Sequence, residues 1–247
     1  MATYSDEGVV LRTHKLGEAD RIVTILTRGH GKIRAVAKGV RRTSSRFGAR
    51  LEPFSQCDLL IVQGRSLDIV SQAVSRRLLG RAWLDDYARY TAAEVMVETA
   101  DRLVGEERQP APRQYSLLVG ALRVLGSETS DGPRPATMVL DSYLLRSLAT
   151  AGYAPALAGC ASCGAQAGLD FFSPQSGGLV CRRCRPPGSA SVTPAAVAYL
   201  GALLSGQWEE TRQVSPTTAH LASGLVAAFA NWQLERGLRT LGHLDRG

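Results

Sequence analysis

Short apolar runs separated by turn residues fill residues 1–80 and predict β-strands. Four of the runs lie at residues 9–11, 22–26, 53–62 and 67–75. A fifth run, residues 31–37, alternates, with Ile33, Ala35 and Ala37 on one face and a mainly cationic opposite face. Five short strands with a long loop before the fourth fit a small barrel of the OB type. An SH3-like barrel would give a similar pattern, so strand counting leaves both folds open.

The apolar spacing changes to a helical period after residue 80. Helices are predicted within residues 83–106, 115–125 and 136–151. Another begins at Thr193 and Pro194, a capping residue followed by a first-turn proline. A last helix is predicted from residue 217 to about residue 238, with Leu221, Leu225, Phe229 and Trp232 at core spacing.

Two C-x-x-C pairs form the strongest local signal in the chain. Cys160 and Cys163 make the first pair, and Cys181 and Cys184 make the second, with 17 residues between the pairs. Each pair can present two thiolates from one tight turn, and two such turns complete a tetrahedral zinc site. Four cysteine ligands leave no position open for water, so the predicted zinc ion is structural. Free or redox-active thiols are the alternative.

Residues around these cysteines fit the same interpretation. Gly177 and Gly178 predict a hairpin before the second pair, as in a zinc ribbon. The nearby arginines 182, 183 and 185 are expected to offset the charge of the thiolates. Contact with nucleic acid is a second, less favoured interpretation of these arginines. The fifth cysteine, Cys57, lies in an apolar run and is predicted to be an ordinary core residue.

Positive charge is concentrated near the N-terminus. The formal net charge is +7, and residues 1–80 hold 14 Lys and Arg against 7 Asp and Glu. Residues 31–50 contain no carboxylate and seven cations: Lys32, Arg34, Lys38, Arg41, Arg42, Arg46 and Arg50. A cationic strand that leads into a cationic, glycine- and serine-containing mobile loop predicts a nucleic-acid-binding surface. A solvated charged loop without a ligand is the alternative.

Aromatic residues are scarce in this basic part of the chain. Residues 1–80 contain only Tyr4, Phe47 and Phe54. Phe54 follows a proline into a strand and is predicted to be core, which leaves Phe47 as the candidate for base stacking. We therefore expect phosphate contacts to dominate binding, to give it a steep salt dependence, and to leave the base edges free.

The sequence contains no recognised catalytic motif. Phosphate-binding loops, dinucleotide fingerprints, zinc-protease and serine-hydrolase motifs are all absent, and the four histidines are scattered. No enzymatic activity is therefore predicted. Because no apolar run reaches about 18 residues and no secretory signal is visible, we expect a cytoplasmic protein without a membrane span.

Taken together, the motifs resemble the RecO family of bacterial DNA repair and recombination mediators over nearly the full chain. The resemblance is carried by GE-x-D at residues 17–20, AKG-x-R at 37–41, L-x-PF at 51–54, and GY-x-P at 152–155 before the cysteines. It favours the OB barrel over the SH3-like one and implies an α+β, multidomain chain. The expected parts are a five-stranded OB-type β-barrel (1–80), a helical domain in two segments (81–155 and 190–247), and an inserted four-cysteine module that is zinc-ribbon-like (156–189).

The resemblance also implies a function. Such proteins bind single- and double-stranded DNA and anneal complementary strands, including strands coated with single-strand-binding protein. With the partner RecR they help to load RecA, which implies a nucleoid-associated location. Two other classes remain open: a nonspecific RNA or ribosome-associated binder, and a scaffold whose basic domain docks an acidic protein tail.

Overall fold

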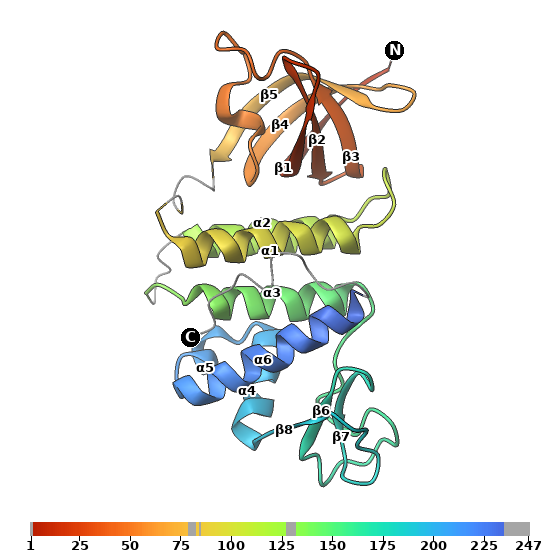
Figure 1. The fold of residues 1–247 in the computed structure, drawn as a ribbon, viewed down its shortest axis with the longest axis vertical. Helices are drawn as coiled ribbons and strands as arrows, with labels where there is room; N and C mark the ends of the chain where they lie inside the picture. Colours follow the sequence, from red (N-terminus) through yellow and green to blue (C-terminus); the bar gives the residue numbers. More distant parts are fainter. Residues whose placement is uncertain (1, 79–82, 84, 127–131, 235–247) are drawn as a thin grey trace. The chain divides into compact units, whose positions relative to one another are not determined.

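The computed structural model describes residues 2–78, 83, 85–126 and 132–234 (Figure 1). The chain divides into two compact units, residues 1–133 and 134–247. The boundaries expected at residues 80, 155 and 189 stay predictions. Two sequence predictions, the helical role of Leu84 and the helix beyond residue 234, lie outside the described residues.

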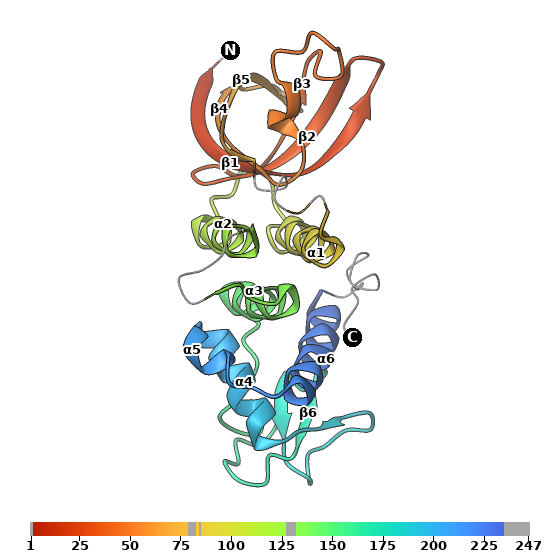
Figure 2. The same ribbon diagram turned by 90° about the vertical axis from the view of Figure 1, so that its left-hand side faces the viewer.

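Five strands form a closed barrel in the first unit. They are β1 (Thr3–Leu16), β2 (Asp20–Thr27), β3 (Gly31–Ala37), β4 (Ser55–Val62) and β5 (Asp68–Leu78). The strand order is β1-β2-β3-β5-β4, and β1 pairs with β4 to close the ring (Figure 2). Among the pairings of these five strands, the short β3–β5 one is parallel and the others are antiparallel. This five-stranded barrel confirms the predicted OB-type fold.

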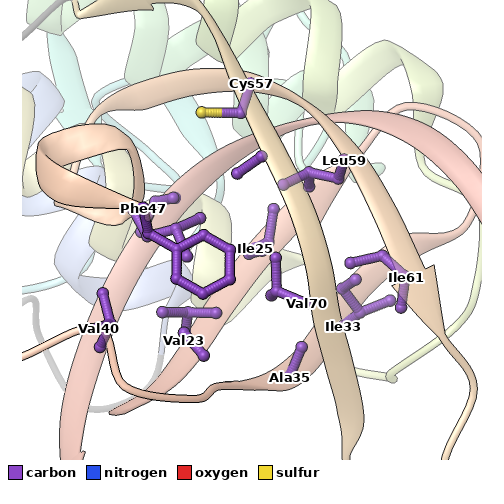
Figure 3. Packing of buried hydrophobic residues seen from close by; sticks show 14 residues of the cluster. Val23, Ile25, Ile33, Ala35, Val40, Phe47, Cys57, Leu59, Ile61 and Val70 are labelled. Atoms are coloured by element: carbon purple, nitrogen blue, oxygen red, sulfur yellow. The ribbon is translucent and has the colours of Figure 1, made fainter. Parts of the chain in front are cut away.

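The barrel interior follows the alternation of the sequence. Ile25, Ile33 and Ile61 are at most 1% exposed and face one another across the interior (Figure 3). Successive side chains of a strand point to opposite faces, so the polar residues between these positions lie on the outside. Burial of the apolar set stabilises the ring because each such side chain leaves water.

Two helices pack beneath one end of the barrel. α1 (Tyr87–Leu103) and α2 (Pro112–Gly126) lie side by side in Figure 2 and one behind the other in Figure 1. Asp86 caps α1 by accepting a hydrogen bond from the backbone N–H of Arg89. The loop between the helices touches the start of β3, where a Cβ on Gly31 would lie 1.7 Å from the carbonyl oxygen of Gln109. Glycine is therefore required at that contact.

The second unit is helical, with a small sheet inserted. Its elements are α3 (Ala136–Thr150), β6 (Phe171–Ser173), β7 (Gly178–Val180), β8 (Ala190–Ser191), α4 (Pro194–Ser205), α5 (Trp208–Thr211) and α6 (Pro216–Gln233). The predicted cap at Thr193 is confirmed, since its hydroxyl accepts from the backbone N–H of Ala196. Trp232 was predicted to be core, and this is wrong because it is 52% exposed. Within the described residues, no helix combines the length and apolarity needed to cross a membrane.

Candidate nucleic-acid interface and metal centre

The loop between β3 and β4 is anchored in the barrel by apolar side chains. Val40, Phe47 and Leu51 are 8%, 1% and 1% exposed and belong to the core cluster of the barrel. Figure 3 shows Val40 and Phe47 among the inward-facing residues of the strands. We call residues 38–50 the cationic loop. Its glycines and serines predicted mobility, but these anchors hold its backbone against the barrel.

Phe47 is one of these anchors and not a stacking platform. The prediction that it stacks on bases is wrong, because its ring is 1% exposed and packs in the barrel core. Its polar neighbour is the guanidinium of Arg46, which lies 5.0 Å from the ring centroid. The cationic loop therefore has no exposed aromatic side chain.

Hydrogen bonds attach the cationic loop to the turn between β1 and β2. The carbonyl oxygens of residues 17 and 18 accept from the Arg41 guanidinium at 3.1 and 2.8 Å. The carbonyl oxygen of residue 19 accepts from the backbone N–H of Arg41 at 3.0 Å. The Asp20 carboxylate accepts from the backbone N–H of Gly39 at 2.7 Å. Arg41 thus joins two loops as well as carrying charge.

The remaining cations of this loop carry uncompensated charge. They are Lys38, Arg42, Arg46 and Arg50, all exposed. None of the four forms an ion pair with a residue that the structure describes, and no carboxylate occurs in residues 38–50. The guanidinium of Arg50 instead donates to the carbonyl oxygen of Arg46 at 2.5 Å. Four unpaired cations on an anchored backbone are suited to bind phosphates.

The two cations of β3 have other partners. Lys32 is 9% exposed, and its ammonium group donates to the carbonyl oxygen of Asp101 at 2.7 Å and pairs with the carboxylate at 3.0 Å. Arg34 pairs with Glu107 at 2.5 Å. Both side chains lie on the outer face, as predicted; α1 covers Lys32, whereas Arg34 stays exposed. Lys32 was predicted to be one of the nucleic-acid-binding cations, but its ammonium group is nearly buried and its charge is paired with Asp101.

Asp101 is the centre of this contact between barrel and helix. Its carboxylate also accepts from Arg12 of β1 at 2.7 Å. Burial alone would raise the pKa of Asp101, but the hydrogen bonds from Arg12 and Lys32 outweigh burial and hold the pKa below its ordinary value. The charge of Lys32 is thus used to dock α1 on the barrel.

The four predicted cysteine ligands lie together in the second unit. Their sulfur atoms are all within 4.8 Å of one another, and the sulfurs of Cys163 and Cys181 are 3.9 Å apart. Zn–S bonds of about 2.3 Å in a tetrahedral site place the sulfurs about 3.8 Å apart. The four cysteines could therefore hold a metal ion, and their spacing fits zinc.

A hairpin of β6 and β7 positions these ligands, as predicted. Residues 156–161 run along β7, where Leu179 donates to Ala156 at 2.8 Å and accepts from Ala161 at 2.7 Å through the backbone. Gly178, with a φ of +149°, allows this close approach, because a Cβ there would lie 2.4 Å from the carbonyl oxygen of Ala156. The two cysteine turns are thereby brought face to face.

The surroundings of the sulfurs shift the thiol pKa values in opposite directions: the pKa of Cys181 is lowered by backbone hydrogen bonds, whereas hydrogen bonds to Cys163 and Cys181 raise the pKa of Cys184 to about 12. A hydrogen bond from the backbone N–H of Cys181 to the sulfur of Cys160 lowers the pKa of Cys160 to about 6. The side chain of Arg183 hydrogen-bonds to Cys163, which raises the pKa of Arg183. Arg185 stacks over the ring of Phe171, 4.2 Å from its centroid. The contact of Arg183 with Cys163 fits the predicted offset of thiolate charge, whereas Arg185 packs on an aromatic ring.

The core roles predicted for Cys57 and Phe54 are confirmed. Cys57 is completely buried, and burial raises the pKa of its thiol to about 11. Phe54 is 4% exposed and packs edge-on against Trp83. The fifth cysteine is therefore chemically unlike the four that cluster.

Sequence reasoning missed the acidic partners of the basic stretch. Asp20 belongs to the GE-x-D motif, so the motif was a signal that could have identified it. Asp101 and Glu107 had no such signal, because they lie 69 and 73 residues beyond Lys32 and Arg34. Only the packing of α1 against the barrel brings those charges together.

Comparisons with known proteins match one family over nearly the full length of the chain. Residues 1–78 match the family model described as "Recombination protein O N terminal", and residues 84–242 match "Recombination protein O C terminal". The DNA repair protein RecO of Cutibacterium acnes is 57% identical over 246 residues, with complete coverage of both chains. The proteins of the same name from Nocardioides sp. and Thermobifida fusca are 54% and 52% identical, with coverage of at least 98% of each chain.

Proposed function

The chain belongs to the RecO family of DNA repair proteins, and we propose that it is a DNA-binding recombination mediator. It anneals complementary single strands and, with RecR, helps to load RecA onto DNA coated with single-strand-binding protein. Its partners are single- and double-stranded DNA, RecR and single-strand-binding protein, and RecA indirectly. It acts in the cytoplasm at the nucleoid and needs no catalytic chemistry of its own.

The anchored cationic loop is the observation that carries this proposal. Lys38, Arg42, Arg46 and Arg50 present charge without carboxylate partners among the described residues, and the loop has no exposed aromatic ring. Phosphate contacts hold a strand without occupying the hydrogen-bonding edges of its bases. Two strands held in this way can still pair with each other, as annealing requires.

We also propose that the cysteine cluster binds one structural zinc ion. Cys160, Cys163, Cys181 and Cys184 would be its ligands, and zinc bound there would cross-link the two cysteine turns without catalytic chemistry. The close grouping of the four sulfurs supports this assignment. A metal with four protein ligands contributes to folding because its ligands come from distant positions in the chain.

The proposed function is tested by annealing complementary oligonucleotides, bare and coated with single-strand-binding protein. The test variant is Arg42→Ala/Arg46→Ala, which removes two unpaired charges and leaves Arg41 to hold the turn. The control is Arg28→Ala/Arg76→Ala, which removes the same charge from the barrel at residues that pair with Glu7. We expect the wild type and the control to anneal both substrates and the test variant to lose annealing.

Salt dependence gives a second readout of the same experiment. Four phosphate contacts predict a slope of about −3 in log affinity against log salt for single-stranded DNA, and loss of two arginines reduces its magnitude by about 1.4. A test variant that anneals like the wild type would show that the cationic loop is not the DNA surface. Tight binding without annealing, or preference for RNA in competition, would leave a general nucleic-acid binder.

A further inference from the structure

Leu16 is an exposed apolar residue at the tip of the β1–β2 hairpin. It is the last residue of β1 and is 38% exposed, and Lys15 beside it is also exposed. Gly17, with a φ of +57°, begins the turn, and a Cβ placed there would meet nothing within 4 Å. The tip is therefore exposed to solvent, and burying the Leu16 side chain against a ligand would be favourable.

This tip is held at the edge of the cationic loop. Arg41 donates to the carbonyl oxygens of Gly17 and Glu18, the two residues that follow Leu16. Lys38 and Arg42 flank Gly39 and Arg41, which make the bonds to the turn. A strand whose phosphates contact those cations would run beside the turn that follows Leu16.

The chemistry of the tip favours bases over phosphates. The exposed carboxylate of Glu18 repels phosphate, whereas Leu16 offers an apolar surface. Bases in single strands expose apolar faces, and proteins use leucine as well as aromatic side chains against unstacked bases. Since Phe47 is buried, the cationic loop itself has no aromatic side chain for this contact.

We propose that Leu16 contacts the bases of single-stranded DNA whose phosphates lie on the cationic loop. This inference rests on the proposed function and adds a base-contacting residue to it. The contact is independent of base identity, because every base has an apolar face. It gives a preference for single strands, since the faces of bases in a duplex are stacked.

The test measures the affinity of the full chain for two probes, an oligothymidylate and an abasic strand of equal length. For Leu16→Ala we expect an affinity for oligothymidylate about three- to tenfold lower, from the apolar area lost. Its affinity for the abasic strand and its salt slope should be unchanged, because no charge is altered. Leu16→Trp should bind oligothymidylate more tightly than the wild type and the abasic strand equally well.

The matched control is Val74→Ala, which truncates a 61% exposed apolar residue on β5. It should bind both probes like the wild type. If Leu16→Ala binds both probes like the wild type, or weakens both equally, the inference is overturned and the proposed function stands. If the wild type binds neither probe, the proposed function itself fails.

Discussion

At the scale of single residues, Phe47 has a packing role at a position where the sequence favours a DNA-binding role. Its place in the sequence, between Arg46 and Gly48, is typical of a base-stacking residue in a basic loop. The structure instead buries its ring beside Val40 and Leu51, where it anchors the loop. The side chain thus acts on DNA binding only by fixing the positions of its charged neighbours.

We therefore expect Phe47→Leu to lower stability without lowering DNA affinity. Leucine still fills most of the site, so the free energy of unfolding should fall by about 1 to 2 kcal/mol. Chemical denaturation and binding to a single-stranded oligonucleotide measure the two effects. The control Leu51→Ala creates a larger cavity under the same loop and should cost about 2 to 4 kcal/mol. If Phe47→Leu lost DNA affinity while its stability was unchanged, the result would indicate that Phe47 stacks on bases.

At the scale of elements, the contact between α1 and the barrel depends on charge. The carboxylate of Asp101 in α1 forms ion pairs with Lys32 of β3 at 3.0 Å and with Arg12 of β1 at 2.7 Å. Lys32 is nearly buried, so removal of the carboxylate leaves an ammonium group without its partner. Breaking a buried pair costs about 3 to 5 kcal/mol, and the partial exposure of Arg12 reduces this to about 2 kcal/mol here.

Asp101→Asn should accordingly lose about 2 kcal/mol of stability at neutral pH. The pKa of Asp101 is lowered in the folded state, so its contribution is present above the ordinary value of 3.8 and is lost as the pH falls through the folded-state pKa. Denaturation midpoints of the two proteins should therefore converge in acid. Glu98→Gln, which alters a pair within α1, is the control and should show a smaller difference. A difference that stays constant into acid would contradict the role of the Asp101 charge.

The elements also show what the sequence could predict. Alternation and glycine-containing turns located all five strands, and the C-x-x-C spacing identified the four clustered sulfurs, because both signals are local. The burial of Lys32 and Phe47 could not be predicted, because it depends on α1 and on the barrel interior. A local pattern indicates which face a side chain takes, while tertiary packing decides whether that face meets water.

At the scale of the whole molecule, the two candidate sites lie in different units. The cationic loop belongs to residues 1–133, and all four cysteines belong to residues 134–247. A zinc ion bound by those cysteines would connect turns that β6 and β7 hold together, and the hairpin itself is short. We therefore expect the stability of this small module to depend on a bound metal ion.

Removal of zinc by a chelator should therefore loosen one part of the chain selectively. We expect one zinc per chain by elemental analysis and, after chelation, faster hydrogen exchange in residues 156–191, while amides of β1–β5 keep their protection. Cys160→Ser should lose the metal, whereas Cys57→Ala, which alters the buried thiol of the barrel, should retain it. Absence of zinc, with exchange unaffected by the chelator, would show that the cysteine turns are held by the hairpin and the backbone of residues 156–161 alone.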